Sequence, residues 1–216
     1  MSNEILKRIL SSIFILPISV FFIIKGSLFF IIFILLIYIL IIYEWYLMSN
    51  KKKYFVPGLI FILISGLFTY LFRGNTLSDL YTFLIVILIC VSTDIGGYLF
   101  GNIFKGPKLA KKISPNKTIS GMFGSYLFSI LIFYIAISYS NLISIELNYV
   151  FNKFNILYII IISTISQLGD LLISLFKRIS KIKHTSNILP GHGGLLDRFD
   201  GMIFAIPFAY LFLNIL

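Results

Sequence analysis

The amino-acid sequence predicts an all-α, polytopic transmembrane bundle of about seven helices. Of its 216 residues, 59% are hydrophobic and only 12% are charged, and the mean hydropathy is +1.01. Seven hydrophobic runs are separated by short charged stretches. A membrane-spanning helix needs roughly 17–25 such residues, and the middle five runs meet this requirement. The runs are Ile9–Ile24, Leu28–Leu47, Phe55–Phe72, Leu80–Phe100, Met122–Ser140, Asn155–Ile173 and Met202–Leu216.

The first and last runs are short, and each contains a proline that can kink a helix, Pro17 or Pro207. The first run follows Lys7 and Arg8, as in a signal peptide. No small-residue cleavage site follows, and the next run begins almost at once, so we expect a retained helix. The single cysteine, Cys90, lies inside a hydrophobic run, which favours a packed core residue and excludes an intramolecular disulfide.

The net charge of +10 raises the question of a nucleic-acid partner, but the positions of the charges argue against one. The chain has eighteen lysines and arginines. With a cytoplasmic N-terminus, only Lys25, Arg73 and Lys153 lie outside, which leaves fifteen inside. This positive-inside bias predicts a multi-pass protein of the inner (cytoplasmic) membrane, with its polar loops facing the cytoplasm. Some of this charge would meet anionic lipid headgroups.

Within one integrated bundle, we distinguish an N-terminal region of transmembrane helices with short connectors, 1–92, from a C-terminal region that holds the candidate site residues, 93–216. The second region holds two long loops, Gly101–Gly121 and Lys177–Asp200, and each follows a helix with an acid near its end, Asp94 or Asp170. Polar loops at membrane depth are tolerated when they are buried in protein or line a wet cavity. We therefore expect both loops and both acids to meet around one polar cavity open to the cytoplasm.

Two acids three residues apart, Asp197 and Asp200, follow the glycine pair Gly193-Gly194. If Arg198 begins the last helix, both carboxylates lie on one face of its first turn. Helix capping by one of them is the alternative. Glycine amides can cradle phosphate oxygens, and magnesium takes one or two carboxylates together with water and substrate phosphate. For Asp170 the alternative is an acid at a helix end paired with a nearby base. The predicted metal ligands are Asp170, Asp197 and Asp200.

Basic residues supply the complementary charge. Ser114–Thr118 combines a turn, a cation and two hydroxyls just before a helix expected to begin near Gly121, which favours a phosphate contact for Lys117. We interpret Lys108, Lys111 and Lys112 as a solvated face or a topology signal. The basic residues that follow Asp170 are Lys177, Arg178, Lys181 and Lys183.

Four residues have open roles. His192 could be a general base or a metal ligand, but with no second suitable histidine nearby a zinc site is not expected. His184 fits an ordinary loop residue. Glu44 and Trp45 are interpreted as an interfacial tryptophan beside an acid, with a structural role.

The segment from Ser174 to Asp200 resembles the signature of the phosphatidate cytidylyltransferase, or CDP-diacylglycerol synthase, family. The match includes Ser174-Leu-Phe-Lys-Arg178, Lys183 and Leu189-Pro-Gly-His-Gly-Gly-Leu-Leu-Asp-Arg-Phe-Asp200. Supporting matches are Asp94–Tyr98 with Gly101, Ser114–Thr118 and Gln167–Asp170. Three departures are His184 in place of an acid, Asn116 and Ser120 in place of a lysine and an acid, and a chain shorter than typical members.

The resemblance implies the transfer of a cytidylyl group from CTP to phosphatidate, giving CDP-diacylglycerol and pyrophosphate for phospholipid synthesis. It implies a magnesium cofactor, with a second, monovalent cation as an additional candidate. Expected partners are the two substrates and the lipid bilayer, with no nucleic acid, and a homodimer is a candidate assembly. The implied catalytic residues are Asp170, Asp197, Asp200, Lys177 and Arg178. The implied substrate-binding residues are Asp94, Ser114, Lys117, Thr118, Ser174, Lys183, His192, Gly193, Gly194 and Arg198.

Three other functions were weighed. A CTP-dependent polyprenol or phytol kinase would release CDP instead of pyrophosphate. A cation transporter would place its acids near the bilayer midplane, whereas here they lie at the predicted cytoplasmic boundary. A CDP-alcohol phosphotransferase would continue from Asp200-Gly201 with a different pattern from the Met-Ile-Phe-Ala found here.

Overall fold

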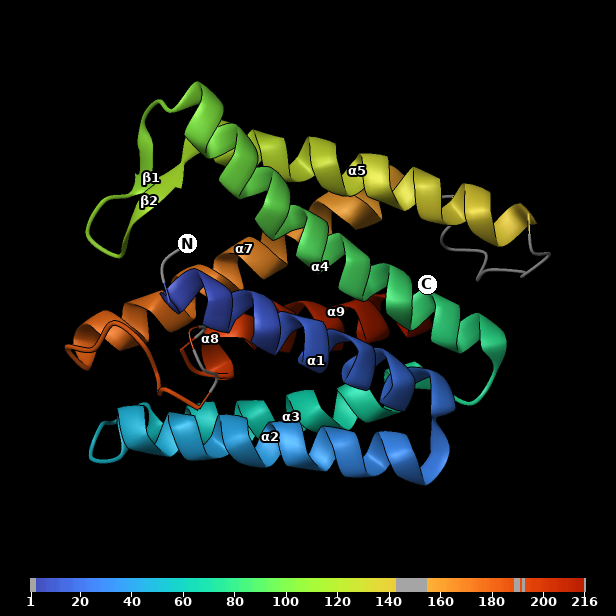
Figure 1. Cartoon of the computed structure of the whole chain (residues 1–216), viewed down its shortest axis with the longest axis horizontal. Helices are drawn as coiled ribbons and strands as arrows, with labels where there is room; N and C mark the ends of the chain where they lie inside the picture. Colours follow the sequence, from blue (N-terminus) through green and yellow to red (C-terminus); the bar gives the residue numbers. More distant parts are fainter. Residues whose placement is uncertain (1–2, 143–154, 189–190, 192, 216) are drawn as a thin grey trace. The chain divides into compact units, whose positions relative to one another are not determined.

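The computed structural model describes residues 3–142, 155–188, 191 and 193–215. Within these ranges the chain forms seven long helices, one helical turn and a two-stranded hairpin (Figure 1). Each long helix coincides with one predicted hydrophobic run, which confirms the all-α, polytopic prediction. The long helices are α1 (Asn3–Lys25), α2 (Ser27–Ser49), α3 (Phe55–Arg73), α4 (Leu77–Phe104), α5 (Ile119–Leu142), α7 (Asn155–Ile179) and α9 (Met202–Ile215).

Five of the described helices, α2, α3, α4, α5 and α7, are long and apolar enough to cross a membrane. The apolar part of α9, Met202–Asn214, is shorter, as the sequence predicted. The protein is therefore a multi-pass membrane protein. Cys90 is a free, fully buried residue of α4, which confirms its predicted place in the core.

The chain folds into two compact units. Unit 1 contains residues 1–71 and 176–199, and unit 2 contains residues 72–175 and 200–216. These units divide the chain differently from the predicted regions 1–92 and 93–216. The signature loop after α7 belongs to the unit of the N-terminal helices, while the segment with Asp94 and Asp170 lies in unit 2.

In unit 1, α2 and α3 pack through polar and aromatic contacts. The hydroxyl of Tyr38 hydrogen-bonds the side chains of Ser65 and Thr69, at 3.0 and 2.8 Å. Trp45 is 1% exposed and donates its indole N–H to the carbonyl of Phe55. Trp45 is thus a buried anchor of the unit, so the interfacial position predicted for it is wrong, although a structural role remains.

In unit 2, α4 and α5 approach each other through glycines. A Cβ at Gly96 would lie 2.6 Å from the carbonyl oxygen of Gly124, and one at Gly121 would lie 2.6 Å from that of Gly97. Small residues allow this close packing of membrane helices. The glycines that follow Asp94 therefore serve helix packing in this structure.

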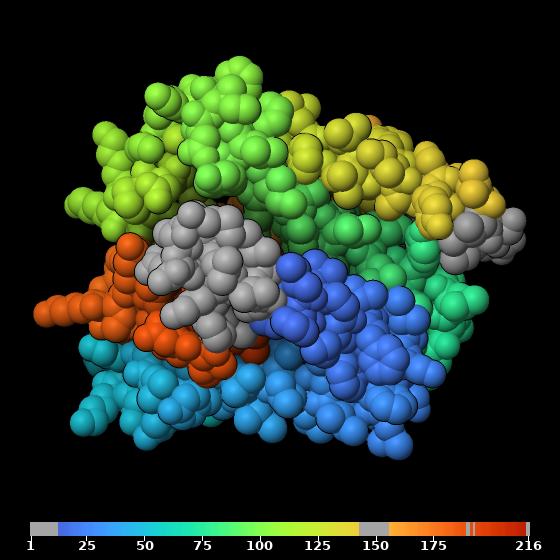
Figure 2. Space-filling view, viewed as in Figure 1, coloured from blue at the N-terminus to red at the C-terminus, as the bar shows by residue number. Residues whose placement is uncertain are grey.

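The segment between α4 and α5 forms a β-hairpin, which the sequence analysis did not predict. Strand β1 (Lys108–Ala110) pairs antiparallel with β2 (Ser114–Thr118), and Lys108 lies opposite Thr118. Thr118 accepts a hydrogen bond from the amide of Gly121, so it caps α5. Side chains of the hairpin segment lie on the molecular surface drawn in Figure 2, and Lys108, Lys111 and Lys112 are exposed. Its lysines were expected in an irregular loop, but the backbone pairing gives them defined positions.

The last helix begins at Met202, as the last predicted run does, so the condition that Arg198 begins this helix is not met. Arg198 lies in the single turn α8 (Leu196–Phe199), and α9 begins at Met202. Gly201 separates the two, and its carbonyl accepts the amide of Ala205, as a helix N-cap does. Asp197 and Asp200 therefore do not share the first turn of one helix, and the spacing argument for a common face does not apply.

Candidate active site

The signature loop of unit 1 begins where α7 ends. The amide of Ile182 donates to the carbonyl of Lys177, and the amide of Lys181 donates to that of Arg178. With Lys181 at φ 57°, these bonds form a Schellman motif. The hydroxyl of Ser180 donates to the carbonyl of Met48, so the end of α7 is fixed to the end of α2. Lys177 thus projects from a helix end with a defined orientation.

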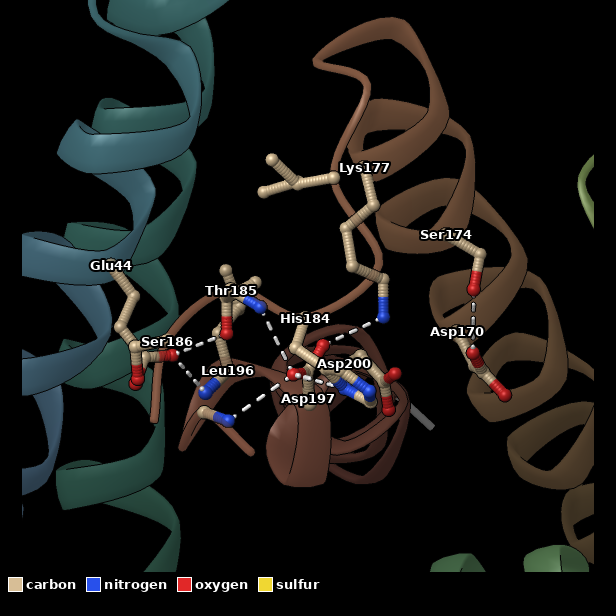
Figure 3. A network of polar contacts seen from close by, with 12 residues as sticks. Glu44, Asp170, Ser174, Lys177, His184, Thr185, Ser186, Leu196, Asp197 and Asp200 are labelled. Carbon is tan, nitrogen blue, oxygen red and sulfur yellow. Dashed lines mark hydrogen bonds and ion pairs between the residues drawn. The ribbon is translucent and has the colours of Figure 1, made fainter. Parts of the chain in front are cut away.

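Lys177 forms the central ion pair of this loop. Its Nζ lies 2.7 Å from Oδ1 of Asp197 in α8, and the two side chains are 10% and 7% exposed (Figure 3). The other oxygen of Asp197 accepts the amides of Thr185 and Gly194, at 3.1 and 3.2 Å. The imidazole Nδ1 of His184 lies 3.6 Å from the same oxygen. Asp197 is therefore held from several directions.

These contacts determine the charge of Asp197. Burial raises the pKa of its carboxyl, but the hydrogen bond and charge of Lys177 and the amides of Thr185 and Gly194 outweigh burial, so the pKa lies below its ordinary value. Asp197 is consequently ionised near neutral pH. An ionised carboxylate is the form that can hold a divalent cation.

The loop is also anchored by Glu44, from the last turns of α2. Its carboxylate is fully buried and accepts four hydrogen bonds (Figure 3). The sequence analysis assigned this residue only a general structural role. The position of Glu44 near the end of an apolar run did indicate a more specific role, because an acid there is costly unless it has hydrogen-bonding or charged partners. The four donors are Thr185 Oγ1, Ser186 Oγ and the amides of Leu195 and Leu196, at 2.6 to 2.8 Å.

The adjacent glycines Gly193 and Gly194 of the signature are required for separate structural reasons. Gly193 has a φ of +85°, in the left-handed region that side chains disfavour. A Cβ on Gly194 would lie 1.9 Å from Oγ1 of Thr185 and 2.6 Å from Oε2 of Glu44. The amide of Gly194 is engaged by Asp197, so in this state it is not free to bind phosphate.

Unit 2 holds a second ion pair of the same kind. Nζ of Lys117, from β2, lies 2.5 Å from Oδ2 of Asp170 in α7, and their side chains are 26% and 25% exposed. The other oxygen of Asp170 accepts the hydroxyl of Ser174 at 3.2 Å (Figure 3). Lys117 also reaches the carbonyl of Gln167, at 3.4 Å. The predicted pairing of Asp170 with a nearby base is thus present, and the base comes from the hairpin.

The remaining predicted residues differ in their surroundings. Asp200 is buried, and its Oδ1 accepts the amide of Gly201. Ser114 lies at the start of β2, and Thr118 caps α5. Asp94, Arg178, Lys183 and Arg198 are exposed. His192 lies outside the described residues.

Among the described residues, no three His, Cys, Asp or Glu side chains gather into a group that could hold a metal ion by themselves. Magnesium does not need such a group, because water and substrate phosphate can complete its coordination. The roles of Asp170, Asp197 and Asp200 as metal ligands, and the cavity that the two loops were expected to share, remain predictions.

Comparison with known proteins supports the resemblance drawn from the signature. A model of the cytidylyltransferase family matches residues 59–216. The chain is similar to a phosphatidate cytidylyltransferase of Rickettsia felis, with 39% identity over 99% of this chain and 94% of the relative. A Rickettsia conorii protein of the same name is 37% identical over 97% of this chain and 91% of its own length. One from Staphylococcus epidermidis is 44% identical over 59% of this chain and 45% of its own length. The chain therefore belongs to the cytidylyltransferase family.

Proposed function

We propose that this protein is a nucleotidyltransferase that transfers the cytidylyl group of CTP to phosphatidate, giving CDP-diacylglycerol and pyrophosphate. Similarity to phosphatidate cytidylyltransferases over almost the full chain supports this reaction. The observation that carries the proposal is the lysine–aspartate pair in each unit, Lys177 with Asp197 and Lys117 with Asp170. A reaction between two phosphates needs these groups: cations for phosphate oxygens and carboxylates for a divalent cation.

The chemistry requires positioning more than a dedicated base. An ionised phosphate oxygen of phosphatidate forms a bond to the α-phosphorus of CTP. The bond from that phosphorus to the bridging oxygen of the β-phosphate breaks, and its electron pair leaves with pyrophosphate. Because the nucleophile is already ionised near neutral pH, the protein mainly aligns the two phosphates and neutralises their charge. His192 is then better assigned as a hydrogen-bond donor to phosphate, or as a residue that orders the loop.

The lysines are the proposed ligands of the triphosphate, together with Arg178 and Lys183. In this structure, Lys117 and Lys177 each form an ion pair with a carboxylate, which directs the ammonium group. A triphosphate offers both lysines stronger acceptors, so each can exchange its carboxylate for phosphate oxygens. These contacts strengthen as negative charge grows on the leaving pyrophosphate, which favours the transition state.

Magnesium is the proposed cofactor, with a second, monovalent cation as an addition. Its proposed ligands are Asp170 and Asp197, with Asp200 as a further ligand or an orienting residue. Carboxylate oxygens suit a hard cation, and the lowered pKa of Asp197 keeps that carboxyl ionised. When bound, magnesium would neutralise phosphate charge. Further substrate contacts are proposed for Asp94, Ser114, Thr118, Ser174, Gly193, Gly194 and Arg198.

The proposed location is the inner membrane, with the site facing the cytoplasm, where CTP is available. The positive-inside distribution of lysine and arginine supports this orientation. The proposed partners are the substrates and the bilayer, and nucleic acid is not among them. A homodimer remains a candidate assembly.

Product analysis tests the reaction. Purified protein in detergent, given CTP labelled in the cytosine or in the γ-phosphate, should form labelled CDP-diacylglycerol and release labelled pyrophosphate. Both products should require phosphatidate and magnesium. Release of CDP with transfer of the γ-phosphate to a lipid would identify a kinase instead and overturn the proposal.

A further inference from the structure

We propose that Glu44 is a positioning residue of the proposed cytidylyl transfer. Its carboxylate holds the loop between α7 and α8 in the conformation that presents Asp197 and Lys177. The inference rests on the proposed function, since it assigns a role in the same reaction. Glu44 itself lies in α2, more than 130 residues before the loop, and all of these groups belong to unit 1.

The contacts of Glu44 fix two separate stretches of the loop. Oε2 accepts the hydroxyl of Thr185 and the amide of Leu196, both at 2.7 Å. Oε1 accepts the hydroxyl of Ser186 at 2.6 Å and the amide of Leu195 at 2.8 Å. Each oxygen therefore joins one hydroxyl from before the glycine segment to one amide from after it. A single carboxylate closes the loop at both ends.

The same loop atoms connect Glu44 to Asp197. The hydroxyl of Thr185 donates a hydrogen bond to Glu44, and its amide donates one to Asp197. Gly194 gives its amide to Asp197, and the next two residues give theirs to Glu44. Neighbouring hydrogen-bond donors of the loop therefore bind either the carboxylate of Glu44 or that of Asp197. If the hydrogen bonds to Glu44 are lost, the amides that hold Asp197 lose their alignment, and Lys177 loses a partner of fixed position.

The geometry requires a carboxylate of this length. A backbone amide reaches each oxygen of Glu44, and a backbone amide cannot rotate to become an acceptor. In Glu44→Gln the new side-chain NH₂ would face one of these N–H groups, so a donor would meet a donor. In Glu44→Asp the carboxylate would be one methylene too short to reach both stretches. Neither conservative change should preserve the loop.

Hydrogen–deuterium exchange of the full-length protein in detergent measures the loop directly. In Glu44→Gln, peptides covering Thr185–Ser186 and Gly194–Asp197 should exchange at least about 10-fold faster, because a hydrogen bond to a charged group is worth about that factor or more. A saturating mixture of CTP and magnesium should restore part of the protection. Exchange in the remaining peptides of α2 and α3 should stay as in the parent protein.

Kinetics of the same variants give the second readout. Glu44→Gln should raise KM for CTP and lower kcat for pyrophosphate release, each by about 10-fold or more, since displacing the proposed phosphate and metal ligands affects both binding and the chemical step. Tyr38→Phe is the matched control, because Tyr38 lies in the same helix as Glu44 and the change removes its partly buried hydrogen bonds to Ser65 and Thr69. It should lower thermal stability without changing loop exchange or KM.

Two milder substitutions, both at Thr185, test the proposal if Glu44→Gln does not fold. Thr185→Val removes one donor to Glu44 and should shift loop exchange and KM in the same direction by a smaller factor, while Thr185→Ser keeps the hydroxyl and should restore both. The proposal is overturned if Glu44→Gln and Thr185→Val behave like Tyr38→Phe, with loop exchange and kinetics unchanged. If the parent protein makes no pyrophosphate, the proposed function fails, while the exchange data still decide whether Glu44 holds the loop.

Discussion

The two lysine–aspartate pairs use the same chemistry in different settings. Lys117 and Asp170, in unit 2, are about one quarter exposed, and their further contacts are with the carbonyl of Gln167 and the hydroxyl of Ser174. Lys177 and Asp197, in unit 1, are at most one tenth exposed, and backbone amides hold the aspartate in addition to the lysine. One pair can separate at little cost, whereas the other is part of the fold of its loop.

This difference matters because a buried ion pair and an exposed one respond differently to the loss of a partner. Removing one member of a buried pair leaves an uncompensated charge and lowers the free energy of unfolding by about 3–5 kcal/mol. An exposed pair contributes about 1 kcal/mol or less to that free energy. The proposed exchange of Lys117 for a cation at Asp170 should therefore disturb its surroundings little. Asp197 also holds the loop between α7 and α8, because it accepts the amides of Thr185 and Gly194.

The largest expected effects come from Asp170→Asn and Asp197→Asn. Each removes a charge proposed to hold the metal and should lower activity at least about 100-fold, the magnitude seen when charge stabilisation is lost at catalytic centres. Asp197→Asn should also lower thermal stability, because Lys177 is left buried without its partner, while Asp170→Asn should keep it. Kinetics and thermal unfolding of both purified variants check this.

The double variant provides the control for this prediction. Residues that act as a unit are not additive, so Asp170→Asn with Asp197→Asn should be scarcely less active than either single variant. Near-normal turnover of folded Asp197→Asn would remove its metal role and leave it as a structural residue of the loop.

Smaller effects are expected from the lysines. Lys177→Met and Lys117→Met should each raise KM for CTP or lower kcat by about 10- to 150-fold, the range for a charged phosphate contact. Only Lys177→Met should also destabilise the protein, because it leaves Asp197 buried and unpaired. Steady-state kinetics with CTP as the varied substrate provide the measurement.

Lys51, Lys52 and Lys53 are the matched control, since they are exposed and lie in the link between α2 and α3. Their neutralisation should leave the kinetics unchanged. If they matter as much as Lys117 and Lys177, bulk positive charge and not specific contact explains the effects.

The smallest expected signal is an absence of labelling. Both pairs must face the compartment that supplies CTP, so cysteines placed at Lys111 and Asn187, which are exposed, should not react with a membrane-impermeant reagent added outside intact cells. The native Cys90 is buried and gives little background. The same cysteines should react after the membrane is permeabilised. Efficient labelling from outside would reverse the predicted orientation.

The sequence predicted the helices well because a long apolar run by itself identifies a membrane-spanning helix. Each of the seven runs became a helix, and Cys90 lies in the core as expected. Asp170, Asp197 and their lysines could be selected because charges are rare in this chain. The signature supplied the functional meaning, and the structure then supplied the specific pairing of Lys117 with Asp170 and of Lys177 with Asp197.

The features that the sequence did not predict depend on contacts between distant residues. Glu44 meets its partners 141 to 152 residues later in the chain, so no local pattern gives its role. The hairpin around Lys108–Thr118 has few strand-forming residues and depends on backbone pairing. The separate helical turn α8 around Arg198 was not predicted either, because it depends on Gly201, which interrupts the segment before α9 begins at Met202.

Equilibrium binding of CTP, measured with and without magnesium, tests most directly whether Lys117 and Asp170 exchange each other for the triphosphate and the metal. In the parent protein, magnesium should strengthen CTP binding. In folded Asp170→Asn, this strengthening should be largely lost, while CTP should bind without magnesium at least as tightly as in the parent, because Lys117 is released to meet phosphate. An Asp170→Asn protein that keeps the full effect of magnesium, and binds CTP more weakly without it, would contradict the account.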